Sequence, residues 1–289
     1  MRFIIMHLIA GLSFADCRRV IAIGDLHGDV GAFQSTLRVA SLIGPTSCSW
    51  TGGTTTLVQL GDVLDRGTQE QECWDLLQAL KREASAVGGE VITLLGNHEI
   101  LNLRGEAARF IHPKAHEHFG PDRAAAFAPG GTLAREFAEC PVVAIIDDTA
   151  YVHAALPHGA TRESCADLNA ATRAWLLGEV PQCPPMLLPD HGSPVWNRAY
   201  SSPSDVEPSS RNCRELKRDL GILGVSRVVV GHTPQDNINA ACDGAVWRCD
   251  TGMSAFVMDG VNEALEIVDG CVRILRAETS FAPPPRDFF

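Results

Sequence analysis

Side chains able to bind metal ions or transfer protons occur at the ends of three apolar runs. The runs end in Gly24-Asp25-Leu26-His27-Gly28, Gly61-Asp62-Val63-Leu64-Asp65-Arg66-Gly67 and Gly96-Asn97-His98-Glu99. Short apolar runs bounded by glycine predict buried strands, so each junction places chemically active side chains at the carboxyl end of a strand. One such junction is usually a simple turn, whereas three in one chain indicate a functional site.

Two later histidines follow apolar runs in the same way. His153 ends the run 149–152, and His232 comes shortly after the run 227–230. The candidate metal ligands are therefore Asp25, His27, Asp62, Asn97, His153 and His232. Mixed oxygen and nitrogen donors suit Mn, Fe or Zn better than Ca or an all-thiolate site. Asp62 could bridge two divalent ions, which lie about 3.5–4 Å apart in hydrolases of phosphate esters.

Alternating strands and helices are expected to position the first three motifs. Residues 20–23, 54–60 and 90–95 read as strands because they are apolar and rich in β-branched side chains. Residues 30–43 and 69–87 read as helices, since their apolar side chains recur at helical spacing. This β-α-β-α-β order favours an α/β architecture.

The second half of the chain has shorter predicted elements. Residues 101–131 form a polar, partly helical insertion directly after the third motif. Residues 142–146 and 149–153 predict a hairpin. Further helices are expected at 166–177 and 212–223, and further strands at 227–230, 245–248, 255–258, 264–268 and 272–276.

Composition limits the classes of protein that the chain can represent. With 289 residues, 45% of them hydrophobic, it is long enough to bury the core of one large domain. The formal net charge of −11 argues against a nucleic-acid-binding surface, which needs clustered Lys and Arg. An anionic substrate must therefore be held by local arginines or metal ions.

The N-terminus has the outline of a secretory signal peptide. Residues 1–15 contain one basic residue and a short apolar run, and they end in the small residue Ala15. The run is too short for a stable membrane span. We expect a signal peptide at 1–15, a single domain at 16–280 and a flexible proline-rich tail at 281–289. Cleavage would direct the protein to the secretory pathway, the endoplasmic reticulum or the outside of the cell. If the segment instead packs on the domain, the protein is cytoplasmic.

The ten cysteines do not reveal a metal or redox motif. The chain has no Cys-x-x-Cys pair, so a zinc ribbon or a thioredoxin-type site is unsupported. Disulfides are allowed in the secretory pathway, whereas a cytosolic chain would keep its cysteines as thiols. The spacing does not identify any pairing.

The three motifs together resemble those of the phosphoprotein phosphatases in the calcineurin-like metallophosphoesterase superfamily. They occur in that family's order, and the resemblance extends over residues 20–258. Asn102, the run Pro194-Val195-Trp196-Asn197-Arg198 and the run Asp250-Thr251-Gly252-Met253-Ser254 are most similar to the Shewanella-like phosphatase branch. The resemblance implies an α/β (α+β) fold with a central β-sandwich of mixed sheets, flanked by helices on both sides.

The resemblance also implies two divalent metal ions, of Mn, Fe or Zn. The first ion would be held by Asp25, His27 and Asp62. The second would be held by Asp62, Asn97, His153 and His232. A hydroxide that bridges the two ions would attack phosphorus directly, without a covalent phosphoenzyme.

The remaining implied roles concern the leaving group and the phosphate. His98 would be the general acid, oriented by Asp65, because an alkoxide leaving group needs a proton. Arg66 and Arg198, with Asn97, would bind the substrate phosphate, since a planar guanidinium matches phosphate oxygens. Arg198 also has a simpler interpretation as a solvated loop charge beside a packed Trp196. Glu99 is expected to be structural and to pair with a nearby cation.

We therefore expect a metal-dependent protein phosphatase whose partner is a phosphorylated protein. Phosphoserine and phosphothreonine are the substrates of the family at large, and phosphotyrosine is that of some relatives of this branch. One alternative is a diadenosine-tetraphosphatase-like nucleotide hydrolase on the same scaffold. Another is a pseudo-enzyme that binds phosphoproteins without turning them over, although a general acid would then have no purpose. The oligomeric state is not readable from the sequence.

Overall fold

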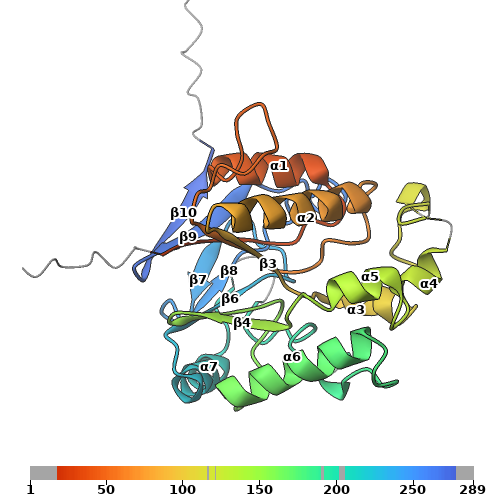
Figure 1. Ribbon diagram of the computed structural model, residues 1–289. Coiled ribbons are helices and arrows are strands. Elements are labelled where there is room, and N and C mark those ends of the chain that lie inside the picture. Colours follow the sequence, from red (N-terminus) through yellow and green to blue (C-terminus); the bar gives the residue numbers. More distant parts are fainter. Residues whose placement is uncertain (1–17, 116, 121, 190–191, 202–205, 278–289) are drawn as a thin grey trace, which may run out of the picture.

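Two five-stranded sheets face each other at the centre of the molecule, and helices cover their outer sides (Figure 1). The computed structural model describes residues 18–115, 117–120, 122–189, 192–201 and 206–277. The predicted signal peptide and the predicted tail lie outside these residues. The expected sandwich of mixed sheets is confirmed, because each sheet contains parallel and antiparallel pairs.

The first sheet has the strand order β10-β9-β1-β2-β3. Its strands are β1 (Arg19–Ile23), β2 (Thr56–Gln59), β3 (Glu90–Thr93), β9 (Glu263–Val268) and β10 (Cys271–Arg276). The three strands β1, β2 and β3 are parallel, and helices α1 (Val30–Val39) and α2 (Glu70–Ala86) connect them. Asp29 caps α1, where its carboxylate accepts a hydrogen bond from the Ala32 N–H. The predicted β-α-β-α-β order is therefore confirmed.

The second sheet has the strand order β4-β5-β6-β8-β7. Its strands are β4 (Val143–Ile146), β5 (Thr149–Val152), β6 (Arg227–Val230), β7 (Asn239–Ala241) and β8 (Val246–Arg248). Strands β4 and β5 form the predicted antiparallel hairpin, and β5, β6 and β8 run parallel. The carboxyl ends of β5 and β6 therefore lie at one edge of this sheet.

Helices flank both sheets. Helices α1 and α2 cover the first sheet, whereas α6 (Arg162–Leu176) and α7 (Ser210–Leu223) cover the second (Figure 1). The insertion after the third motif contributes short elements at one end of the sandwich. These are η1 (Pro113–Ala115) and α4 (Arg123–Phe127). Helix α3 (Asn97–Leu103) begins within the third motif, α5 (Thr132–Phe137) follows the insertion, and a second 3-10 turn, η2 (Pro185–Leu187), comes later.

Alternate side chains of β1 are buried on opposite faces. Val20 and Ala22 pack with Tyr151 and other side chains of the second sheet, whereas Ile21 packs with residues of α1 and α2. A strand that is covered on both faces reads as a continuous apolar run, which is why the sequence predicted it as buried.

One predicted strand, residues 255–258, is wrong. The Ser254 carbonyl accepts hydrogen bonds from the N–H groups of Val257, Met258 and Asp259, so the segment closes into a compact turn. Phe256 and Met258 are 40% and 56% exposed. The apolar residues that suggested a strand therefore lie on the surface instead of in a sheet.

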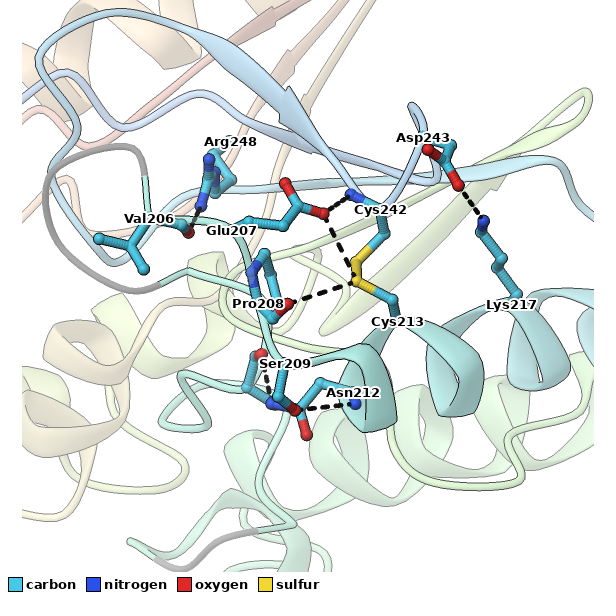
Figure 2. Close-up of a disulfide and its surroundings, with 11 residues drawn as sticks. Val206, Glu207, Pro208, Ser209, Asn212, Cys213, Lys217, Cys242, Asp243 and Arg248 are labelled. Atoms are coloured by element: carbon cyan, nitrogen blue, oxygen red, sulfur yellow. Dashed lines mark hydrogen bonds and ion pairs between the residues drawn. A yellow bond between two sulfur atoms is a disulfide. The ribbon is translucent and has the colours of Figure 1, made fainter.

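A disulfide between Cys213 and Cys242 joins α7 to the turn between β7 and β8 (Figure 2). Neighbouring contacts hold the same region. The Cys242 N–H donates to Glu207 over 2.7 Å, and the Arg248 guanidinium donates to the Val206 carbonyl over 2.9 Å. The disulfide thus ties the helical layer to the edge of the second sheet.

Removal of this disulfide should destabilise the protein. The bridge closes a loop with a sequence separation of 29 residues, for which the loss of chain entropy in the unfolded state predicts about 2–4 kcal/mol. We expect the double variant Cys213→Ser/Cys242→Ser to lose that much unfolding free energy in urea titrations without reductant. Cys271→Ser is the control, because Cys271 is exposed and free. Equal midpoints for the double variant and the wild type would contradict the prediction.

Among the described residues, no helix is both long and apolar enough to cross a membrane.

Candidate metal and phosphate site

The predicted ligands converge because their strands end at the same place. Asp25 and His27 follow β1, Asp62 follows β2, His153 follows β5 and His232 follows β6. These five side chains are buried. The carboxyl ends of neighbouring parallel strands meet at one edge of a sheet. The site therefore draws ligands from both sheets of the sandwich.

Asp62 lies at the centre of the ligands. Its Oδ2 atom is 3.6 Å from His27 Nε2, and its Oδ1 atom is 3.4 Å from His153 Nε2. Its two oxygens thus face two different histidines. This geometry fits a carboxylate that bridges two cations.

The remaining ligands lie next to these histidines. His153 Nε2 is 3.0 Å from Asn97 Oδ1 and 3.2 Å from His232 Nδ1. Asp25 Oδ2 is 4.0 Å from His27 Nε2. The structure therefore brings all six predicted ligands together, in two groups that share Asp62.

Main-chain carbonyls orient the imidazole rings. His27 Nδ1 lies 3.0 Å from the Leu64 carbonyl, and His153 Nδ1 lies 2.8 Å from the Leu60 carbonyl. A ring nitrogen that donates to a carbonyl leaves the other nitrogen with a free lone pair. In both residues that free nitrogen is Nε2, which points toward Asp62.

The electrostatics of the cluster also fit a cation site. Burial lowers the pKa of His27 to about 3, and burial together with His153 lowers the pKa of His232 to about 2. Both rings are therefore neutral, and each can offer a nitrogen lone pair to a metal ion. Burial and the nearby charges of Asp250 and Asp62 raise the pKa of Asp25 well above its usual value. The repulsion between Asp25 and its neighbouring carboxylates, beside the neutral rings of His27 and His232, is an environment that a divalent cation would stabilise.

Unusual backbone conformations coincide with the site. His27, Asp62 and His232 have φ values of 43°, 54° and 69°, and both Asp65 and Arg66 have φ values of 66°. A residue other than glycine rarely adopts positive φ, and such strain of about 1–3 kcal/mol per residue is common at functional sites. The strain here supports a functional constraint on these five residues.

Two motif glycines allow the close approach of the carboxylates. A Cβ atom on Gly96 would collide with the side chain and the N–H group of Asp62. A Cβ atom on Gly231 would lie 2.5 Å from Asp25 Oδ1. Glycine is therefore required at both positions, because any side chain would displace a candidate ligand.

His98 lies beside the ligands but has a different environment. Its Nδ1 atom is 2.7 Å from Asp65 Oδ2, and its Nε2 atom is 4.0 Å from Asp62 Oδ2. Burial alone would lower the pKa of His98, but the carboxylates of Asp62 and Asp65 outweigh burial and raise it. Distance alone would permit His98 as a third ligand with His27 and Asp62. The contact with Asp65 instead favours a ring that donates a proton.

Both predicted phosphate-binding arginines lie at the border of the site. Arg66 is exposed, and its Nη2 atom is 3.4 Å from His98 Nε2. Arg198 Nη1 donates to the His232 carbonyl over 3.0 Å and also to the Thr233 hydroxyl. Each guanidinium therefore lies next to a different residue of the site.

A comparison with known families agrees with this geometry. The profile of the calcineurin-like phosphoesterases matches residues 18–236. The chain belongs to this family. It is therefore a phosphoesterase, a hydrolase of phosphate esters, and the family uses divalent metal ions.

Two relatives of this phosphoesterase are protein phosphatases by name. It is 33% identical to Shewanella-like protein phosphatase 2 of Arabidopsis thaliana, over 91% of this chain and 78% of the relative. It is 30% identical to Shewanella-like protein phosphatase 1 of Plasmodium berghei, over 84% of this chain and 69% of the relative. The predicted resemblance to the Shewanella-like branch is thus confirmed.

Solved structures share the fold of this phosphoesterase. The cold-active protein-tyrosine phosphatase of a psychrophilic Shewanella species superimposes with a TM-score of 0.71 at 24% identity, covering 90% of this chain and 80% of that one. A protein serine/threonine phosphatase from Saccharomyces cerevisiae gives a TM-score of 0.62 at 15% identity, covering 91% and 81%. At these identities the similarity shows the fold alone.

The expectation that Glu99 pairs with a nearby cation is wrong. The phosphoesterase buries this carboxylate completely, and it accepts hydrogen bonds from the main-chain N–H groups of Gly96, Asp62, Val63 and Leu64 instead of pairing with a cation. Burial and the charge of Asp62 raise its pKa to about 7. Glu99 is structural, as expected, but it fixes the loop that carries Asp62 through backbone groups.

Sequence reasoning did not place Asp250 in the site. Asp250 is buried, and burial raises its pKa to about 6. Its charge acts on Asp25, so it adds to the negative charge of the ligand cluster. Its position just after a predicted strand was the same signal that identified Asp25 and Asp62.

Sequence reasoning also missed Phe110, which the insertion contributes. Its ring centroid is 4.9 Å from that of His98 in an edge-on arrangement, and its carbonyl accepts the Arg66 N–H over 2.8 Å. Phe110 therefore contacts both the predicted acid and the main chain of a predicted phosphate-binding residue. No local pattern distinguished this phenylalanine in the sequence.

Proposed function

We propose that this phosphoesterase is a two-metal protein phosphatase that hydrolyses phosphate monoesters on phosphoproteins. The observation that carries the proposal is the arrangement around Asp62. Its two carboxylate oxygens face His27 and His153. The Nε2 atom of His98, whose ring is bound by a second carboxylate, lies 4.0 Å from Asp62 Oδ2. Binding of a phosphoprotein alone would not require such a proton donor, so this arrangement favours turnover.

Two groups of ligands would hold the two ions. The first consists of Asp25, His27 and Asp62, and the second of Asp62, Asn97, His153 and His232. Their mixed oxygen and nitrogen donors favour Mn, Fe or Zn. When bound, the ions would activate water for direct attack and neutralise charge on the phosphoryl oxygens.

The protein side chains supply the other parts of the reaction. His98 would donate a proton to the leaving oxygen, and Asp65 would hold the ring and stabilise its charged form. Arg66 and Arg198, with the Asn97 amide, would bind the phosphate oxygens. Because water is the proposed nucleophile, we expect no phosphoenzyme.

The proposal of a protein substrate rests on the relatives and on the space beside Arg198. Two relatives at 30% and 33% identity are named protein phosphatases. A cavity of about 590 Å³ borders Arg198, and Asn197 and Tyr200 also line it. Such a cavity offers room for residues that flank a phosphorylated side chain.

Turnover of three substrates tests the function. The wild-type protein with added Mn would be assayed on phosphotyrosyl and phosphothreonyl peptides of one sequence and on diadenosine tetraphosphate. We expect higher kcat/KM for at least one peptide than for the dinucleotide, and the two peptides rank tyrosine against threonine. Preference for the dinucleotide would support a nucleotide hydrolase. Peptide binding without turnover would support a pseudo-enzyme.

Replacing Arg198 should weaken phosphate binding. Loss of one charged hydrogen-bond donor costs about 1.5–3 kcal/mol, so Arg198→Ala should lower kcat/KM on a phosphopeptide about 10- to 150-fold. Inhibition by inorganic phosphate should weaken in parallel. Arg198→Lys should lose less, because it keeps the charge but not the planar fork.

Arg173→Ala is the matched control, since Arg173 is half-exposed and forms a surface ion pair with Glu139. If Arg198→Ala behaves like this control, Arg198 is a solvated loop charge, and the proposed phosphate contact is wrong.

We also propose that residues 1–15 are a cleaved signal peptide and that the protein enters the secretory pathway. The Cys213–Cys242 disulfide supports this, because disulfides persist in oxidising compartments. N-terminal sequencing of the natural protein should begin at Asp16, whereas an intact Met1 would overturn the proposal.

A further inference from the structure

Arg123 forms two polar contacts from the insertion, although neither reaches the ligands. The residue begins α4, and its side chain is 11% exposed. Its Nη1 atom forms an ion pair with Glu70 Oε1, and its Nη2 atom donates to Asn102 Oδ1 over 2.8 Å. Its guanidinium also lies 4.8 Å from the ring centroid of Phe127. These contacts fix the orientation of the planar guanidinium group of Arg123.

Both polar partners of Arg123 bind Asp65. Glu70 Oε2 accepts the Asp65 N–H over 2.9 Å. Asn102 Nδ2 donates to Asp65 Oδ1 over 3.0 Å and to the His98 carbonyl over 2.9 Å. The other carboxylate oxygen of Asp65 contacts His98 Nδ1. Arg123 is thus connected to the proposed acid by two short paths.

We propose that Arg123 is a positioning residue that orients the Asp65–His98 pair. The inference rests on the proposed proton-donating role of His98. Arginine has only N–H donors, so its contact requires the oxygen of the Asn102 amide to face Arg123 and its NH₂ group to face Asp65. Without Arg123, the amide of Asn102 could rotate by 180° and present its oxygen to the Asp65 carboxylate.

The second path depends on charge. Glu70 is completely buried, and Arg123 is the cation that pairs with its carboxylate. A buried carboxylate without a cation is strongly unfavourable, so Glu70 would reorient. That change would disturb its contact with the N–H group of Asp65, whose backbone already has a φ of 66°. Arg123 therefore stabilises the backbone position of Asp65, whose carboxylate would hold the general acid.

Leaving groups of different acidity separate positioning from general damage. Protonation matters most for a poorly acidic alcohol, whereas 4-nitrophenolate leaves without much assistance. We expect Arg123→Met to lower kcat about 10- to 100-fold on a phosphothreonyl peptide and no more than about threefold on 4-nitrophenyl phosphate. KM for the peptide should stay nearly constant. An equal loss on both substrates would overturn the proposal, since loss of folding or of metal lowers both.

Further variants distinguish this proposal from the proposed function. His98→Asn should also lose more kcat on the phosphothreonyl peptide than on 4-nitrophenyl phosphate, and this difference should be larger than in Arg123→Met. If it does and Arg123→Met does not, the positioning role is wrong and the proposed function stands. If His98→Asn shows no selectivity, the proposed acid is wrong, and the role of Arg123 is overturned with it.

Arg123→Lys keeps a charge for Glu70 and guards against misfolding of Arg123→Met. One ammonium group is not expected to hold both Glu70 and Asn102, so it should give a smaller loss with the same selectivity. A lysine variant equal to wild type on both substrates would count against the proposal. Arg135→Met is the control, because Arg135 is exposed on the neighbouring helix α5, and it should leave both rates unchanged.

Discussion

Replacing Asp62 with asparagine should lower kcat/KM on a phosphopeptide at least about 10³-fold, which corresponds to about 4 kcal/mol. The two oxygens of Asp62 face His27 and His153, and an amide retains only one oxygen while it presents hydrogens from its other atom. Loss of the carboxylate also removes negative charge that two cations would share. We therefore expect the variant to retain less metal after dialysis, measured by elemental analysis alongside steady-state kinetics.

Asp167→Asn is the matched control for this experiment, because Asp167 is exposed on α6. It should keep wild-type activity and metal content. Full activity of Asp62→Asn with its metal content unchanged would contradict a bridging role.

Replacing His98 with asparagine should have the second largest effect. General acid catalysis contributes about 10²- to 10⁴-fold, so kcat on a phosphothreonyl peptide should fall by that factor. Metal content should stay at the wild-type level, since the Nδ1 atom of His98 is held by Asp65 in the proposed acid role. Unchanged metal content would separate the proposed acid from a ligand, although the distances among His98, His27 and Asp62 alone would permit His98 to bind an ion.

Metal analysis of the same preparation gives the decisive contrast with Asp62→Asn. Metal lost together with activity in His98→Asn would identify His98 as a ligand. Unchanged turnover of the phosphothreonyl peptide would remove His98 from the mechanism.

The predicted elements and the predicted ligands were readable from the sequence for one shared reason. Strands such as β1 and β2 are covered on both faces, so their apolar runs stand out, and the polar residues that interrupt them mark the strand ends. Parallel pairing then brings those ends together, which is why Asp25 and Asp62 lie close although they are 37 positions apart in the sequence. Residues at the ends of apolar runs were therefore predictable as a group.

The contribution of the insertion was not readable, because it depends on contacts without a local pattern. Arg123 reaches Glu70 across 53 positions and Asn102 across 21. Phe110 packs on His98 from a segment with no helical or strand periodicity. Nothing in the residue types or spacing distinguishes these two from ordinary surface residues, so only the folded structure reveals them.

Two other errors have local causes. Glu99 carries a charge that suggested a cation, but its place at the start of α3 gives it main-chain N–H partners. Residues 255–258 are apolar like a strand, but hydrogen bonds to the Ser254 carbonyl fold them into a turn. In both segments main-chain hydrogen bonds determine the local structure, and the residue types alone do not reveal these bonds.

The division of the ligands between the two sheets has a consequence for the order of assembly. Asp25, His27 and Asp62 belong to the first sheet, whereas His153 and His232 belong to the second, so the complete ligand set exists only after the two halves of the sandwich have docked. An ion that needs ligands from both sheets would bind only after the sheets have docked, and not to a chain in which they are separated. Loading of the second group, which combines Asp62 and Asn97 with His153 and His232, would then follow folding instead of nucleating it, and the ion bound there would make separation of the halves less favourable.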